Sequence, residues 1–541
     1  MGTLSLLTTA LLLAQSTAAA QRPPADSLAI TTDELGGRLR LFSSDLFEGR
    51  YPGTRGEALT TAWLISELTS FGIHPGAAGG WLQPVAIVTH QPAPESPPEI
   101  RVTGRVTRTL EHGRDIRLAN YGATPNVEAG GELVFVGYGI DAPVYKWNDF
   151  AGMDLRGKIA VVLVGEPSIP GDSVRFNGMR ASRFGWSLAK IAEMERRGAV
   201  GVLFLRPAGS FPKTPPTGLR RLAGQAAGLR FTGMISDSAV ASLLPPRSHL
   251  PALGALLAAA GRPGFRPRPL GVRLEVRFQT KPVTVTTHNV IGVVPGSDAA
   301  LALEHVVLSA HWDAYGIGPA VNGDSIYNGA LDDGSGVTAL LALARVFAQD
   351  PQRRSITLLF TTAEEWGLLG AEAFVCNGPV PPARIAANLN LDDGLELLGI
   401  KRDAAPLGVE LSTLGQTVAD VARRDGLRVS PDPFPTEGFF LRADNFPFAR
   451  AGVPALYMAL GTDTEGHPAG WADSLAKMYL THDYHAPSDE YDRVVIDLRG
   501  SRQFAEFVRD VTIAVANTPQ RPEWLAGAEF SRAEAPTGCA P

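Results

Sequence analysis

The sequence predicts an α/β fold in which a mostly parallel mixed sheet is flanked by helices. Three apolar runs of strand length, 306–310, 356–362 and 386–391, alternate with stretches of helical periodicity in the second half of the chain. Strands that alternate with helices are typical of parallel sheets, because each parallel crossover returns through a helix. Acidic residues or histidine come directly or almost directly after each run, so we expect a functional site at the carboxyl edge of this sheet.

Other elements follow from periodicity. Helices are predicted at 33–42 and 57–71, where apolar residues recur every three or four positions. Residues 84–135 alternate between apolar and polar side chains, which favours strands. The stretch 336–349 has one apolar face and predicts a helix, and 453–460 predicts a late strand.

Residues 126–275 have the pattern of an inserted β-rich module. Three strand-like runs accompany an amphipathic stretch at 183–197, and no spacing in this region is typical of a nucleophile or a metal site. The segment 206–280 is rich in proline, arginine, glycine and alanine, and it predicts the end of the insert followed by a linker. The remaining divisions are then 21–125 for an N-terminal part of the main domain and 516–541 for a C-terminal tail.

Residues 1–20 are predicted to be a signal peptide, since an apolar stretch from residue 4 ends in three alanines before Gln21. The stretch carries no basic residue, so a buried N-terminal helix is the alternative. No cysteine follows it, and no other stretch is long enough to span a bilayer. We therefore expect an exported protein, periplasmic or secreted, without a stable membrane anchor.

Composition excludes some functions. The 541 residues suffice for two or three domains, and 49 basic against 55 acidic residues give a net charge of −6. Because there is no basic run, a nucleic-acid partner is not expected. The two cysteines allow one disulfide but no thiolate metal site. The oligomeric state is not determined by these features.

Seven polar residues of the second half of the chain have the types that bind or activate a metal. They are His311, Asp313, Asp332, Glu364, Glu365, Asp392 and His485. Carboxylates and neutral imidazoles are ligands of Zn²⁺, and five ligands with one shared carboxylate would hold two ions roughly 3.5–4 Å apart. Each pair alone has an ordinary explanation as a surface pair, a solvated face or a helix cap. Most of the seven residues follow a strand-like run and all lie in the same half of the chain, which favours a metal site.

The ordered motifs HWD, GALDDGSG, EEWGLLGAE, NLD and YHAPSDEYD resemble the zinc aminopeptidases of the M28 peptidase family. The resemblance covers a catalytic core at 283–515. The segment LFSSDLFEGRYPGTRGE is similar to the N-terminal segment of that family, and 126–275 resembles a protease-associated domain. The implied fold is of the zinc-exopeptidase, phosphorylase/hydrolase-like type.

The resemblance implies a role for each residue of the site. His311 and Asp392 would bind one zinc, and Glu365 and His485 the other. Asp332 would bridge the two ions, because the bridging aspartate of the family lies three residues before the serine that Ser335 matches. A cis peptide bond to Asp333 would follow Asp332. Asp313 would orient His311 by accepting its other ring N–H, and Glu364 would be the general base. The cofactor would be two Zn²⁺ per chain and the partner a peptide substrate.

The chain departs from the family pattern at three places. Ala314 follows HWD where a histidine is common, and Ala443-Asp444-Asn445 stands where Ser-Asp-His is common. No tyrosine falls at Phe440 or Leu441, so a second donor to the oxyanion is left unassigned. His482 is an alternative ligand to His485. The motif YHAPSDEYD favours His485.

The sequence as a whole predicts an exported di-zinc exopeptidase, foremost an aminopeptidase. The alternatives on the same fold are a glutaminyl cyclase, a carboxypeptidase-type relative, and a binding homologue without activity. Retention of all five ligands and the base argues against the cyclase and the binding homologue.

Overall fold

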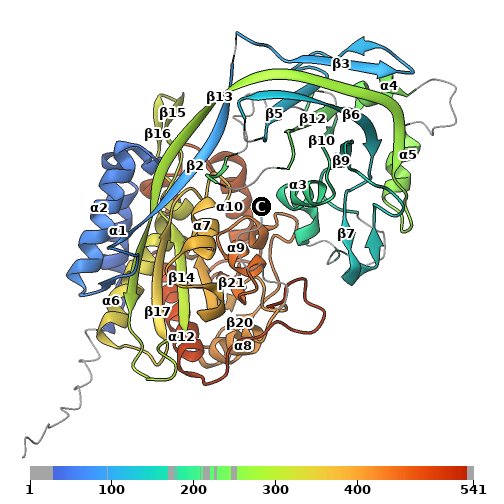
Figure 1. Ribbon diagram of the computed structural model, residues 1–541. Coiled ribbons are helices and arrows are strands. Elements are labelled where there is room, and N and C mark those ends of the chain that lie inside the picture. The colour runs from blue at the N-terminus through green and yellow to red at the C-terminus, as the bar shows by residue number, and fades with distance from the viewer. Residues whose placement is uncertain are drawn as a thin grey trace, which may run out of the picture.

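The computed structural model describes residues 28–532 except for gaps at 94, 123, 168–175, 177, 179–180, 208, 211–219, 225–227 and 245–252. The predicted signal peptide and the last residues of the predicted tail lie outside the described residues. None of the described helices is long and apolar enough to cross a membrane. The chain forms two lobes, and a long curved strand, β13 (Arg268–Val294), runs through both of them (Figure 1).

The sheet of the first lobe confirms the predicted fold class. Its strand order is β21, β18, β14, β17, β13, with bounds β21 (Ala455–Met458), β18 (Ile385–Leu391), β14 (His305–His311) and β17 (Ser355–Thr361). The first four strands are mutually parallel, while β13 is antiparallel to β17 and to β2 (Leu82–Pro92). The result is a mixed sheet with a parallel centre.

Helices cover both faces of this sheet, because its central strands are apolar on both sides. One face packs against α1 (Thr32–Phe42), α2 (Arg55–Ser70), α6 (Ser335–Gln349), α8 (Leu414–Arg424) and α12 (Arg499–Asn517). The other face packs against α7 (Leu369–Asn377) and α9 (Asn445–Arg450). Within β14, Leu308 belongs to the first core and its neighbour Val307 to the second, as the alternation of a strand requires.

The second lobe is built around the N-terminal half of β13. Its strands are β3 (Glu99–Gly104), β4 (Arg108–Thr109), β5 (Ile116–Asn120), β6 (Asn126–Phe135), β9 (Ile159–Leu163), β10 (Gly201–Arg206) and β12 (Phe231–Ser236), with helices α3 (Ser187–Arg196), α4 (Asp237–Leu243) and α5 (Leu253–Ala260). Its core contains Ile100 and Phe278, so the lobe begins before and ends after the predicted insert. Its identity as a protease-associated domain stays a prediction.

The predicted linker at 206–280 is wrong. This segment holds β12, α4, α5 and the first half of β13, in which buried and exposed residues alternate. The proline and arginine content of the segment predicts a linker. The arginines instead occupy exposed positions of the strand, such as Arg273 and Arg277.

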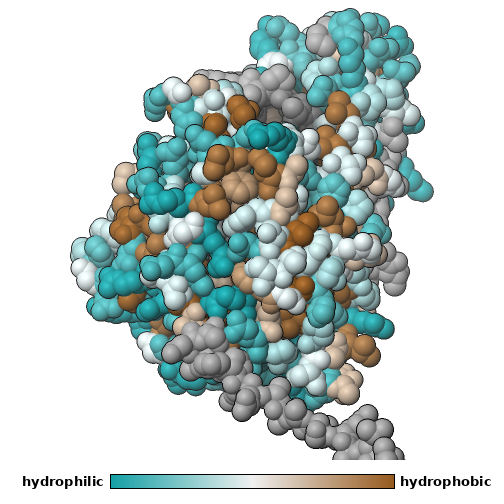
Figure 2. Space-filling model, turned by 90° about the vertical axis from the view of Figure 1, so that its left-hand side faces the viewer, coloured by the Kyte–Doolittle hydropathy of each residue, from teal (hydrophilic) through white to brown (hydrophobic). Residues whose placement is uncertain are grey.

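Short elements complete the structure. They are β1 (His74–Pro75), β7 (Asp141–Ala142), β8 (Trp147–Asn148), β11 (Arg221–Leu222), β15 (Gly316–Val321), β16 (Asp324–Tyr327), β19 (Asp403–Ala404), β20 (Arg428–Val429), α10 (Trp471–His482) and α11 (Tyr491–Val494). Seen from the side of α1 and α2, the surface is mostly polar with several separate apolar groups (Figure 2).

The lobes also meet away from β13. The hydroxyl of Tyr145 donates to Glu529 Oε1 at 2.5 Å, and the main-chain N–H of Ala181 donates to the carbonyl of Pro435 at 3.3 Å. The rings of Trp186 and Phe446 pack edge to face with centroids 4.8 Å apart. The second lobe therefore touches the segment that follows residue 434, which borders the candidate site.

Two helical glycines provide a matched test of packing at the start of α6. A Cβ at Gly336 would overlap the carbonyl oxygen of Leu391 and the carboxylate of Asp333, whereas a Cβ at Gly37 in α1 would meet nothing within 4 Å. We expect Gly336→Ala to lower the free energy of unfolding by about 1–3 kcal/mol. Gly37→Ala should raise it by about 0.5–1 kcal/mol. Denaturant unfolding of both variants measures this, and equal effects would contradict the close approach.

Candidate metal centre

The predicted site residues gather where the parallel strands of the first lobe end. His311 is the last residue of β14, Asp392 directly follows β18, and Glu364 comes three residues after β17. Since β14 lies between β17 and β18 in parallel register, these three ends lie side by side. Asp332 lies in the turn before α6, and His485 lies in the loop after α10.

The carboxylate of Asp332 lies between two imidazoles. Its Oδ1 is 3.0 Å from Nε2 of His311, and its Oδ2 is 3.2 Å from Nε2 of His485. Oε2 of Glu365 is 3.2 Å from the same nitrogen of His485, and Oδ1 of Asp392 is 3.9 Å from Nε2 of His311. The five predicted ligands thus form two groups that share Asp332.

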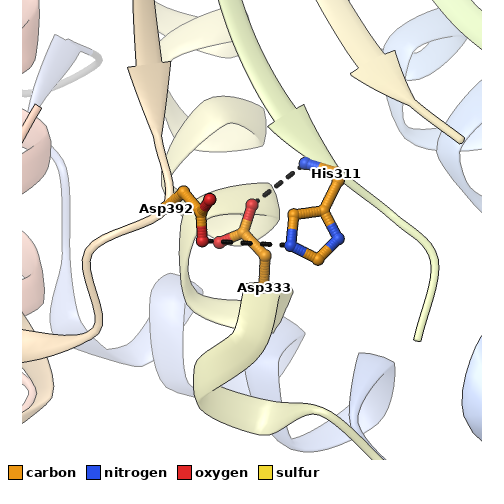
Figure 3. A group of neighbouring side chains, drawn as sticks. All are labelled: His311, Asp333 and Asp392. Atoms are coloured by element: carbon orange, nitrogen blue, oxygen red, sulfur yellow. Dashed lines mark hydrogen bonds and ion pairs between the residues drawn. The ribbon is translucent and has the colours of Figure 1, made fainter. Parts of the chain in front are cut away.

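The neighbouring Asp333 also lies close to His311 and Asp392 (Figure 3). Its Oδ2 accepts the main-chain N–H of His311 at 3.0 Å, and its Oδ1 accepts that of Gly336 at 3.0 Å. Both oxygens are therefore engaged with the backbone, whereas Asp332 faces the imidazoles. The peptide bond between the two aspartates is cis, as the resemblance implied.

The contact predicted between Asp313 and the ring of His311 is present, and the main-chain carbonyl of Asp313 makes it. Nδ1 of His311 lies 3.0 Å from the main-chain carbonyl oxygen of Asp313, while the carboxylate Oδ1 is 3.8 Å away. The carboxylate accepts the main-chain N–H of Glu364 at 3.0 Å instead. Asp313 therefore orients His311 through its backbone and the loop of Glu364 through its side chain.

The donor set fits zinc. Nε2 of His485 is buried without a hydrogen-bond partner among the described residues, although two carboxylate oxygens lie 3.2 Å away. Its other ring nitrogen, Nδ1, is 2.9 Å from the hydroxyl of Tyr315, which fixes the ring. An imidazole nitrogen that faces carboxylates without a hydrogen bond is suited to a cation held between them.

The electrostatics also favour a cation. Burial raises the pKa of Asp392 to about 8 and raises that of Glu365 well above its usual value, with the charge of Asp332 adding to both shifts. Burial opposes protonation of His311, but the hydrogen bond to Asp332 raises its pKa. Without a metal, the site therefore holds protons at neutral pH that a divalent cation would replace.

Glu364 differs from the ligands. Its carboxylate makes no hydrogen bond or ion pair with the described residues, although it borders the same cavity as Asp332 and Asp392. Burial and then the charges of nearby carboxylates raise its pKa well above the usual value. A carboxylate that is near the ligands but not engaged by them is suited to accept and return a proton.

Supporting residues that the sequence did not single out hold the ligand loops. The guanidinium of the fully buried Arg50 donates to the carbonyls of Trp312 at 2.8 Å, Asn328 at 2.5 Å and Gly329 at 2.9 Å. Asp489 accepts the main-chain N–H of Asp332 at 3.1 Å. Both residues lie inside the quoted motifs, but only the folded chain places them against the loop of Asp332.

The departures from the family pattern have structural counterparts. Phe440 is buried against Phe530, with ring centroids 6.1 Å apart, and cannot donate to a substrate. Asp444 is buried and accepts a hydrogen bond from Thr361. His482 ends α10 on the surface and is not part of either ligand group.

A cavity of about 230 Å³ opens beside the ligands. Asp332, Glu364 and Asp392 border it on one side. The rest of its wall is mostly apolar and includes Leu395, Leu407, Phe434, Phe439, Leu475 and Met478. The position of this cavity makes it the candidate pocket for a substrate side chain.

The profile of Peptidase family M28 matches residues 289–512, which contain every residue of the site. This part of the chain is similar to Peptidase family M28. Among curated proteins, "Probable leucine aminopeptidase 2" of Aspergillus fumigatus is 28% identical over 212 residues, 38% of this chain and 40% of its own length. "Vacuolar membrane protease" of Candida dubliniensis is 40% identical over 90 residues, 16% of this chain and 8% of its own. The chain therefore spans less than half the length of these relatives.

Among solved structures, "Aminopeptidase from Aneurinibacillus sp. strain AM-1" aligns with a TM-score of 0.50 at 19% identity. The alignment covers 92% of this chain and 96% of that protein, so the two share a fold.

The raised pKa of Asp392 leads to a prediction about zinc uptake. Below about pH 8 this carboxyl is protonated in the metal-free protein, so zinc must displace a proton in order to bind. We expect the affinity for zinc to rise with pH until about 8 and the binding to release protons. Calorimetric titration in buffers of different ionisation enthalpy measures the release. An affinity that does not change between pH 6 and pH 8 would contradict the predicted protonation.

Proposed function

We propose that this protein is an exported, zinc-dependent aminopeptidase that hydrolyses the first peptide bond of a peptide with a free N-terminus. The observation that carries the proposal is the position of Asp332 between two imidazole–carboxylate groups, with the unengaged Glu364 beside them. The match of residues 289–512 to Peptidase family M28 supports a peptidase. The names of the leucine aminopeptidase relatives support cleavage at the N-terminal end of the peptide.

Five residues would hold two zinc ions. His311 and Asp392 would bind one ion, Glu365 and His485 would bind the other, and Asp332 would bridge them. When bound, zinc would act as a Lewis acid toward the scissile carbonyl and lower the pKa of water at the site. The ring of His311 would donate a hydrogen bond to the carbonyl of Asp313, and the ring of His485 would share one with the hydroxyl of Tyr315. These two contacts would keep both rings in orientation.

Glu364 would carry the proton. Its raised pKa lets it take the proton of the attacking water and deliver it to the nitrogen of the leaving amine. The main-chain N–H of Glu364 is held by the carboxylate of Asp313, which fixes the base relative to the ligands. If the carboxylate of Glu364 moved away from the cavity, it could not both accept the proton of the water and deliver it to the leaving amine.

The cavity supports an apolar first residue. Phe434, Phe439 and Leu407 form much of its wall, and a leucine-like side chain would remove apolar surface from water there. The relative named a leucine aminopeptidase agrees with this preference.

The base is tested by Glu364→Gln. We expect this variant to bind zinc like the unaltered protein but to lose activity by about 10²–10⁴-fold, because it loses a proton carrier and no ligand. Metal analysis and steady-state kinetics measure the two effects separately. Asp332→Ala is the matched comparison and should lose zinc. Near-normal turnover by the glutamine variant would refute the assignment of the base.

A panel of peptides, assayed with the zinc-loaded protein, tests which end of the peptide the protein cleaves. Cleavage should require a free N-terminus and stop on addition of a chelator. Dependence on a free C-terminus instead would favour a carboxypeptidase-type relative. Ammonia release from a peptide that begins with glutamine, without cleavage, would favour a glutaminyl cyclase.

Export is proposed from the N-terminal segment and from Cys376, which is disulfide-bonded. Disulfides persist in oxidising compartments and are rare in the cytosol. We expect the protein from its natural source to begin at Gln21, and N-terminal sequencing measures this. An intact first segment in the mature protein would contradict removal of a signal peptide.

A further inference from the structure

One cation in the wall of the cavity has no acidic partner. Arg442 follows the short helix 439–441 and borders the cavity together with Glu364 and Asp392. Among the described residues its guanidinium donates only to neutral oxygens, the hydroxyl of Tyr484 at 3.0 Å and the carbonyl of Glu437 at 3.5 Å. Arg493 borders the same cavity but is paired with Asp483 at 3.0 Å.

The surroundings hold this guanidinium at the cavity. The ring centroids of Phe439 and Tyr484 lie 5.8 Å and 5.9 Å from its central carbon. The ring of Tyr484 stacks on that of His485 with centroids 3.6 Å apart. Arg442 is therefore connected through one tyrosine to a residue of the candidate metal centre, and most of its N–H groups are left for a ligand.

Arg442 forms no ion pair with a carboxylate of the described residues, although Asp332, Glu364 and Asp392 border the same cavity. In the metal-loaded protein, Asp332 and Asp392 would be engaged with the ions. The guanidinium would then remain available at the place where a substrate binds. A carboxylate matches its planar donors and can accept two parallel hydrogen bonds.

We propose that Arg442, held by Tyr484, binds a carboxylate of the peptide substrate, so that a substrate with this carboxylate is preferred to its neutral counterpart of the same shape. The inference rests on the proposed aminopeptidase function and specifies its substrate. The same chemistry has two sources: the side chain of an N-terminal glutamate, and the terminal carboxylate of a dipeptide. Either source gives the substrate one charge that its neutral counterpart lacks.

The experiment compares charged substrates with neutral counterparts of the same shape. Zinc-loaded protein is assayed with Glu-Leu-amide against Gln-Leu-amide, and with Leu-Leu against Leu-Leu-amide. We expect kcat/KM to favour at least one charged substrate, and Arg442→Gln to reduce that ratio by about tenfold or more while the neutral substrates change little. The first pair isolates the side-chain carboxylate and the second isolates the terminal one.

Two further variants separate charge from structure. Arg442→Lys keeps the charge without the planar donors and should restore part of the preference. Arg493 borders the same cavity but is already paired with Asp483. Arg493→Gln should therefore leave the preference for charged substrates intact. An unchanged ratio in Arg442→Gln, or an equal loss with charged and neutral substrates, would overturn the proposal.

Binding gives a readout that does not depend on turnover. The affinities of the same four peptides are measured by calorimetry with zinc-loaded Glu364→Gln, with and without Arg442→Gln. The charged peptides should bind more weakly by about tenfold when Arg442 is replaced. If the unaltered protein cleaves none of the peptides, the proposed function fails, and the titrations still decide whether Arg442 binds a carboxylate.

Discussion

Crowding of acidic groups at one edge of a parallel sheet is the constraint on which the site depends. Three neighbouring strands end together, and each brings an imidazole or a carboxylate to that edge. Because these groups are buried and close to one another, their ionised forms are costly, and the pKa values of Glu364, Glu365 and Asp392 are raised. Divalent cations would offset the charges, so the arrangement that is unfavourable without metal is favourable with it.

The rest of the first lobe holds these groups through main-chain atoms. Arg50 binds three carbonyls of the loops that carry the ligands, Asp489 accepts the N–H of Asp332, and Asp333 accepts that of His311. Such contacts fix the loops while the ligand atoms stay available, which is the usual requirement for a metal site that acts on a substrate. The burial of Arg50 lowers its pKa to about 10, so it remains charged at neutral pH.

The second lobe bears on the site indirectly. Its β13 continues into the sheet of the first lobe, and its residue Ala181 donates to Pro435, at the start of the segment that forms part of the cavity wall. Phe434, Phe439 and Arg442 all belong to that segment. The apolar pocket therefore depends on both lobes. So does Arg442, which is the one unpaired arginine among the described residues of the cavity wall. The ligands of the candidate metal centre come from the first lobe alone.

The sequence by itself determined the fold class, the strands that carry the site and the residues that gather there, because strand periodicity and ligand chemistry are local properties. The ordered motifs even indicated which of two adjacent aspartates faces both histidines. Tertiary structure alone decided three points that depend on distant residues. The end of the segment predicted as a linker forms the first half of strand β13, which pairs with strands on either side. The acceptor for His311 is a carbonyl of Asp313, since the carboxylate is drawn to Glu364. Arg442 is a cation of the cavity wall because the fold brings Tyr484 beside it, and its guanidinium forms no ion pair within the described part of the chain.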